Sequence, residues 1–212
     1  QVAVVPFVQA AYGNWTFGLD MLAKYEFKQL GKSELNVFAG INVRDTAYKS
    51  NASLFQQSSS SRVFDGYQTP ETEWVAVAGA NWLWFSLSAE QDISGHSDSQ
   101  SYQFSIDLPL FQNNRGLMLK AKVGIDYLTQ DYVNYYYGVG DDEVKTLVGR
   151  FRYQTEAALN YNLSLNLIYP IKNRWALVAE ARHNRLDNNI HHSPLVENDS
   201  MNNLVLAVTY QF

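Results

Sequence analysis

Residues 117–128 read L-M-L-K-A-K-V-G-I-D-Y-L, and their pattern decides the fold. From Leu119 to Tyr127 every odd position is apolar, while the even positions between them hold lysine, glycine or aspartate. A period of two is typical of a β-strand whose two faces meet different surroundings. An amphipathic helix would instead place its apolar residues three and four apart, which this stretch does not do.

The same alternation recurs along most of the chain. The closing stretch reads L-V-L-A-V-T-Y-Q-F over residues 204–212 and puts its large apolar and aromatic side chains on one face. We interpret Tyr210 and the final Phe212 as the C-terminal assembly signal of an outer-membrane barrel. Ten candidate strands follow from the pattern, at residues 2–12, 15–27, 35–44, 73–82, 83–93, 102–110, 117–128, 159–169, 175–186 and 204–212. These strands predict an all-β, antiparallel fold.

The connections between the strands alternate in length. Short turns are expected at 30–33, 79–81, 113–116 and 170–174, and longer loops at 49–70, 94–99, 129–153 and 187–199. Short turns on one side and long loops on the other are typical of a transmembrane β-barrel. We predict one outer-membrane barrel domain over residues 1–212, with about ten strands, short periplasmic turns and long extracellular loops. A barrel of twelve strands is the alternative, if a further strand precedes Gln1.

Composition narrows the class of protein. The 212 residues are long enough for one barrel and contain 14% aromatic residues, which suits aromatic girdles at a membrane interface. No stretch approaches the ~20 apolar residues of a transmembrane helix. The net charge of -5 argues against nucleic acid as a partner, and the absence of cysteine excludes disulfides and thiolate metal sites. The sequence begins at Gln1 without the basic and apolar segments of a signal peptide, so we expect that a signal peptide has already been removed.

The polar face of the strands carries both signs of charge. Seven acids and five bases form this predicted lumen-facing cluster: Asp20, Lys24, Glu26, Arg44, Glu90, Asp92, Asp107, Lys120, Lys122, Asp126, Glu180 and Arg182. Paired charges would seal and stiffen the lumen, because unpaired buried charge is costly. The alternative is a narrow polar pore with Lys120, Lys122 and Arg182 facing Glu90, Asp92 and Asp107.

A soluble lipocalin-like barrel or sandwich would also alternate, with this charged face outside. Strands of 11–13 residues, Tyr and Trp at strand ends and the terminal Phe212 favour the membrane barrel, whose outer surface contacts outer-membrane lipid.

Two stretches of sequence resemble a known family. Residues 135–139 read Y-Y-Y-G-V, and Tyr136, Tyr137, Gly138 and Val139 match the Y-Y-G-V segment of the MipA/OmpV family of MltA-interacting proteins. The block from residue 158 to residue 212 is similar to the C-terminal half of that family. It includes Trp175-Ala176-Leu177, Arg185-Leu186 and the stretch Ser193, Pro194, Leu195 and Val196.

The resemblance implies a non-enzymatic outer-membrane protein that needs the barrel-assembly machinery. It also implies a scaffold that links a lytic transglycosylase to a penicillin-binding protein in murein metabolism. Other members of the family are described as porins, or as adhesins and surface antigens. A narrow porin for small solutes is therefore the first alternative. A surface adhesin, with its binding site in residues 53–68, is the second.

The remaining candidates for chemistry are weak. His191-His192-Ser193 places a base beside a hydroxyl, but sequence neighbours make no catalytic dyad without a third group that orients them. His183 lies near a strand end, where an interfacial role is expected. Asp141-Asp142-Glu143 offers carboxylates to Ca²⁺ without the spacing of a known calcium loop, and is better interpreted as a solvated loop tip. We predict no catalytic residue, cofactor or metal.

Overall fold

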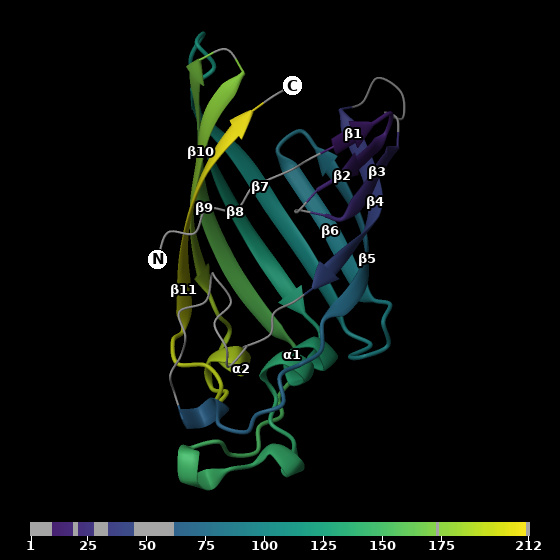
Figure 1. The fold of residues 1–212 in the computed structure, drawn as a ribbon, viewed down its shortest axis with the longest axis vertical. Coiled ribbons are helices and arrows are strands. Elements are labelled where there is room, and N and C mark those ends of the chain that lie inside the picture. Colours follow the sequence, from purple (N-terminus) through teal and green to yellow (C-terminus); the bar gives the residue numbers. More distant parts are fainter. Residues whose placement is uncertain (1–9, 19–20, 28–33, 45–61, 173, 211–212) are drawn as a thin grey trace.

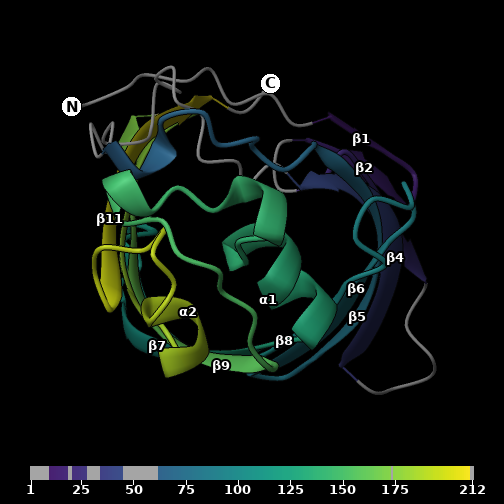
Figure 2. The same cartoon turned by 90° about the horizontal axis from the view of Figure 1, so that it is seen from below.

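A computed structural model describes residues 10–18, 21–27, 34–44, 62–172 and 174–210. One antiparallel sheet contains all eleven described strands, each paired with its neighbours in sequence. They are β1 (Ala10–Tyr12), β2 (Trp15–Phe17), β3 (Ala23–Phe27), β4 (Leu35–Arg44), β5 (Glu73–Trp82), β6 (Phe85–Asp92), β7 (Gln100–Gln112), β8 (Met118–Leu128), β9 (Ala158–Lys172), β10 (Trp175–Arg185) and β11 (Ser200–Tyr210). Seen along its axis, the sheet curls into a barrel (Figure 2). The all-β antiparallel prediction is confirmed.

Several predicted bounds shift by a few residues, since β9 runs to Lys172 and β11 begins at Ser200, and two parts of the predicted layout were wrong. Residues 15–27 are not one strand but the hairpin of β2 and β3, in which Trp15 lies opposite Tyr25. The chain reverses near Gly18, whose amide donates to the Met21 carbonyl at 3.2 Å. The turn between β5 and β6 lies at Leu83 and Trp84 rather than at residues 79–81, since Trp82 still pairs with Phe85. Most of the predicted strand 2–12 lies outside the described residues.

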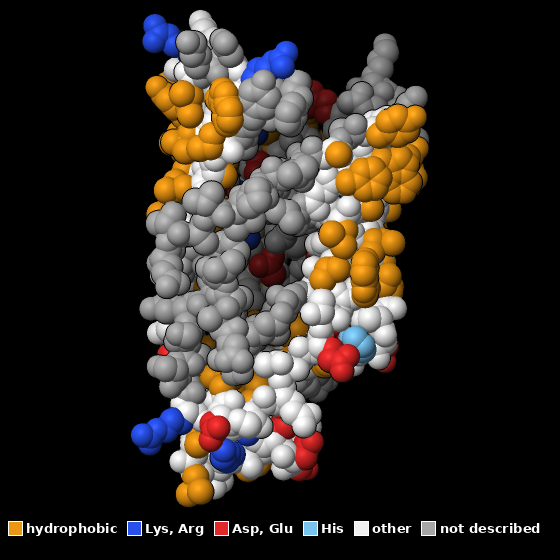
Figure 3. Space-filling model, viewed as in Figure 1, with side chains coloured by type: hydrophobic (Ala, Val, Ile, Leu, Met, Phe, Trp, Pro, Cys, Tyr) orange, Lys and Arg blue, Asp and Glu red, His pale blue; other side chains and the backbone are white. Residues whose placement is uncertain are grey.

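The outer face of the sheet is apolar along its length. In the space-filling view, hydrophobic side chains cover the strands on both sides of the barrel (Figure 3). Exposed aromatic residues gather near both ends of the strands: Trp74, Tyr102, Tyr127 and Tyr161 at one end, and Trp82, Trp84, Phe111, Tyr169 and Trp175 at the other. Aliphatic side chains such as Leu165 and Leu206 are exposed between them. An apolar band between two aromatic girdles is the surface that a bilayer stabilises.

The two ends of the barrel differ. The turns at 83–84 and 113–117 and the connection between β9 and β10 form one end, which we call the turn end. The long connections form the other, the loop end, with the helices α1 (Gln130–Tyr137) and α2 (Asn188–His191). This end also has the 3-10 helices η1 (Arg62–Phe64), η2 (Asp141–Glu143) and η3 (Thr146–Val148). Figure 1 shows α1 and α2 together at this end. Within the described residues, no helix has the length and apolar character needed to cross a bilayer.

Candidate functional site

Helix α1 occupies the loop end of the lumen. Viewed from that end, it lies inside the ring of strands (Figure 2). Thr129 ties its start to β7, because the Thr129 Oγ1 accepts from the Gln100 amide at 3.1 Å and donates to the Gln100 carbonyl at 3.0 Å. In the middle of the helix, the Asn134 side chain exchanges two hydrogen bonds with the Thr155 backbone, at 2.9 and 3.0 Å. The helix is therefore fixed at its start and at its middle.

A buried ion pair lies beneath the helix. The Arg44 Nη2 on β4 lies 2.7 Å from the Glu73 Oε2 on β5, and the two side chains are 7% and 0% exposed. The Arg44 Nε also donates to this oxygen at 3.0 Å, and the Arg44 Nη2 donates to the Ser99 Oγ at 2.6 Å. Ser97 donates from its hydroxyl to the other Glu73 oxygen. A buried pair with this many hydrogen bonds offsets much of the desolvation cost of its two charges.

Tyr136 connects α1 to this pair. Its hydroxyl donates to the Glu73 Oε2 and lies 3.2 Å from the Arg44 Nε. The Arg44 guanidinium also lies 4.7 Å from the centre of the Tyr132 ring, within the range of a cation–π interaction. Burial and the bond to Glu73 raise the pKa of Tyr136, and burial raises the pKa of Tyr132 well above its ordinary value. Both phenols therefore stay neutral at physiological pH, and Tyr136 remains a donor to Glu73.

The two stretches that resemble the family meet in space at the loop end. The Ser193 Oγ donates to the Tyr137 carbonyl at 2.6 Å and accepts from the Leu195 amide at 3.2 Å. Val196 packs against an apolar cluster that α1 forms with its neighbours, whose buried members are Leu128, Tyr132, Val133, Tyr136, Ala158, Leu186 and Ile190. Burial raises the pKa of Tyr137 to about 12. Pro194 lies between the residues that make these contacts, while Gly138 and Val139 follow α1 directly.

Gly138 allows the backbone to pass close to the last turn of α1 as the chain leaves the helix. Its amide donates to the Asn134 carbonyl at 3.0 Å, and a Cβ there would overlap that carbonyl oxygen. Val139, which is 1% exposed, then forms an antiparallel bridge with Tyr153.

The registers place eleven of the twelve residues of the predicted lumen-facing cluster on one face of the sheet, and Asp20 lies outside the described residues. Among the described residues, four ion pairs join two members of this cluster to each other. They join Lys24 with Glu26 at 2.6 Å, Arg44 with Glu90 at 3.6 Å, Lys122 with Asp107 at 3.6 Å and Arg182 with Glu180 at 2.7 Å.

The pairing differs from the one predicted for a pore. Of the facing set, the structure joins only Lys122 with Asp107, because Arg182 bonds to a neighbour on its own strand. Asp92 accepts from the loop amides of Ser94 and Ser97, at 2.8 and 3.0 Å. Asp126 accepts from the side chains of Gln103 and Asn162. The sequence analysis did not identify Glu73 as a candidate site residue. It lies at the predicted start of a strand, and the alternating pattern does not reveal that Arg44 and Tyr136 are its partners.

The other candidates make loop contacts. Asp187 caps α2 by accepting from the Asn189 amide at 2.8 Å, and Ser193 bonds to Tyr137 rather than to a histidine. The His183 Nδ1 lies 2.8 Å from the Asn202 Oδ1 on the outer face. Asp141 pairs with Arg152 at 3.2 Å, and the Glu143 carboxylate accepts from the Gly140 amide. Among the described residues, no group of three or more metal-ligating side chains is found.

These features define a class of protein. A curled antiparallel sheet with an apolar exterior, aromatic girdles and a polar lumen is an outer-membrane β-barrel. The family model of the MltA-interacting protein MipA matches residues 1–212. The chain belongs to the MipA family of outer-membrane proteins.

Three curated relatives carry outer-membrane names. The chain is 38% identical over 89 residues to outer membrane protein OmpV of Vibrio cholerae, and the match covers 42% of this chain and 33% of that protein. Outer membrane protein Omp26La of Vibrio anguillarum is 36% identical over 89 residues, covering 42% and 34%. The putative outer membrane protein YiaT of Escherichia coli K12 is 26% identical over 151 residues, covering 68% and 60%. The matched stretch thus spans about a third of the two Vibrio proteins. No solved structure matches the chain.

Proposed function

We propose that this barrel is a non-enzymatic scaffold that binds a lytic transglycosylase of the MltA type and a penicillin-binding protein at its periplasmic end. The observation that carries this proposal is α1, which fills the loop end of the lumen and is held there by the buried Arg44–Glu73 pair. A barrel closed in this way favours a role for its surfaces over free passage of solutes. The description of the family as MltA-interacting supports the choice of partner.

The periplasmic turns offer a defined surface for such a partner. In the turn between β7 and β8, the Asn113 Oδ1 accepts from the amides of Arg115 and Leu117 at 2.9 and 3.0 Å, which fixes the turn. A Cβ on Gly116 would lie 3.0 Å from the Pro170 Cγ, so this turn lies against the end of β9. Arg115 and Arg174, in the turn after β9, are both exposed. Two exposed arginines at neighbouring turns suit an acidic patch on a periplasmic partner.

Charge reversal at these turns tests the scaffold. We expect the double variant Arg115→Glu and Arg174→Glu to retain about tenfold less lytic transglycosylase in a pull-down at physiological salt, because like charges would then face the partner. Arg152→Glu, at the extracellular end, reverses an exposed arginine in the same sense and is the control, which should bind as the wild type does. Equal retention by all three proteins would refute the docking surface, and no retention by wild type would refute the scaffold.

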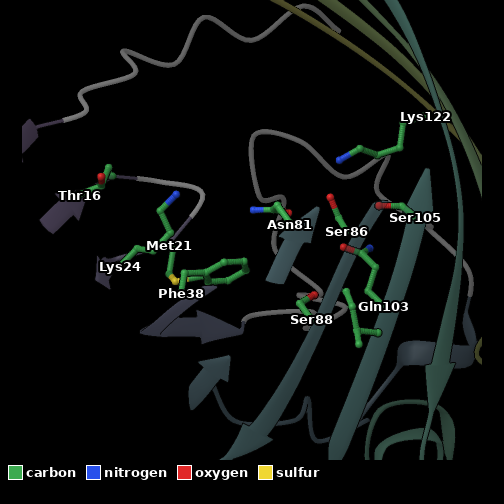
Figure 4. Close-up of a pocket in the computed structure, with 12 residues that line it drawn as sticks. Thr16, Met21, Lys24, Phe38, Asn81, Ser86, Ser88, Gln103, Ser105 and Lys122 are labelled. Atoms are coloured by element: carbon green, nitrogen blue, oxygen red, sulfur yellow. The ribbon is translucent and has the colours of Figure 1, made fainter. Parts of the chain in front are cut away.

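A narrow channel is the second candidate, and a polar cavity in the turn half of the lumen favours it (Figure 4). Planar-bilayer recordings separate the two functions. The scaffold with its closed lumen predicts silent bilayers. Ohmic steps that disappear in Lys120→Met or Glu90→Gln would establish the channel instead. The adhesin segment predicted at residues 53–68 lies largely outside the described residues.

A further inference from the structure

The turn half of the lumen contains a cavity of about 350 Å³. Its walls come from β2, β3 and β4 on one side and from β5 to β8 on the other, and Figure 4 shows the labelled side chains around a common space. The volume lies near the lower limit of the roughly 300–1,000 Å³ that is typical of small-molecule sites. The ion pair beneath α1 and the extracellular loops do not contribute to its lining.

The cavity wall holds polar groups without protein partners. Among the described residues, no hydrogen bond joins the side chains of Thr16, Asn81, Ser86 or Ser88 to the protein. Ser105 is the sharpest case, because it is 2% exposed, lines the cavity and has a hydroxyl without a partner in the described part of the chain. Buried hydroxyls are normally bonded, so these groups are available to water or to a ligand with several hydroxyls.

The charge of the wall is one-sided. Lys24 and Lys122 are the charged side chains among the described lining residues, and the carboxylates that pair with them, on Glu26 and Asp107, are not part of the lining. The Lys24 Nζ also lies 5.7 Å from the centre of the Phe38 ring, which forms an apolar part of the same wall. Ammonium groups, free hydroxyls and one aromatic face together match the chemistry of an acidic sugar.

We propose that this cavity is a binding site for a small, hydroxyl-rich carboxylate of the sugar-acid class. Lys122 bonds the carboxylate, the serine and asparagine side chains bond the ring hydroxyls, and Phe38 lies against the apolar face of the ring. The site lies in the turn half of the lumen, whereas the loop end is occupied by α1. It does not depend on the scaffold proposal, because the two turn arginines lie outside the cavity lining.

Isothermal titration calorimetry on the detergent-purified full chain tests the site with three probes of similar size: glucuronate, glucose and glucosamine. We expect saturable binding of glucuronate in the millimolar range or tighter, with glucose weaker and glucosamine weakest. Lys122→Met should weaken glucuronate by about ten- to hundredfold, the usual effect of losing a charge-assisted hydrogen bond. Lys120→Met is the matched control, since Lys120 lies on the same strand and face but not in the lining.

Heat-modifiable migration on a gel verifies that each variant is folded. Ser105→Ala supplies a second change that retains the charge, and a loss of affinity for both glucuronate and glucose would support the hydroxyl contacts. The proposal is overturned if wild type gives no saturable heat with glucuronate, if the three sugars bind equally, or if Lys120→Met and Lys122→Met weaken binding to the same extent.

Discussion

Replacing Glu73 by alanine is expected to release α1 from the lumen. The change leaves the Arg44 guanidinium buried beneath the helix without its main partner and removes the acceptor of the Tyr136 hydroxyl. Breaking a buried pair from one side costs about 3–5 kcal/mol. We expect the free energy of unfolding to fall by this order, proteases to cut within residues 130–157, and bilayers to show openings that wild type lacks.

The double variant Arg44→Met and Glu73→Met separates the charge effect from simple loss of packing. Because both charges are removed together, no buried charge is left unpaired, and the pair should recover most of the stability lost in Glu73→Ala. Glu180→Ala is the control for an interior acid whose partner, Arg182, is half-exposed at 47%, and it should change stability by less than about 1 kcal/mol. If Glu73→Ala and Glu180→Ala behave alike, the network does not hold the helix.

Gly79→Ala is expected to impair folding of the barrel. A Cβ at this position would overlap the Phe38 ring and lie 2.6 Å from the Leu87 carbonyl oxygen. Backbone atoms of a paired strand cannot move aside without breaking the ladder, so the cost should reach or exceed about 1–3 kcal/mol. The measurement is the fraction of refolded protein that migrates as the compact form on an unboiled gel.

Ala78→Val is the matched control, since Ala78 is exposed on the outer face and a larger apolar side chain there meets lipid. It should refold as wild type does. Refolding of Gly79→Ala to the wild-type level would contradict this prediction, because it would show that the Phe38 ring and β6 move aside without loss of stability.

Most strands were predictable because a membrane barrel imposes two solvents on every strand. The alternation failed at residues 15–27, where Gly18 and Asp20 fall on polar positions of the period although both residues favour turns. The alternation of apolar and polar residues therefore continues across a point at which the chain reverses direction. The turn after β5 was misplaced for a related reason, since Gly79 suggested a turn but serves to let Phe38 approach the strand.

The contacts of α1 could not be predicted from periodicity. Tyr132, Val133 and Tyr136 have the spacing of one helix face, which was the available signal in a segment interpreted as a loop. The face of a strand can be read from its pattern, but the partner of a given side chain cannot. Arg44 is separated from Glu73 by 29 positions and from Tyr136 by 92, and both contacts depend on how the sheet curls.

In the described part of the chain, the sheet pairs each strand with its neighbours in sequence, so these hairpins can form from residues that are close along the chain. Helix α1 behaves differently, because its side chains need Arg44 and Glu73 from early strands and Leu186 and Ile190 from late ones. Contacts over such separations form after local ones, since the entropy of loop closure opposes them. Docking of α1 into the lumen would then be a late step of biogenesis, one that requires both halves of the barrel to have formed.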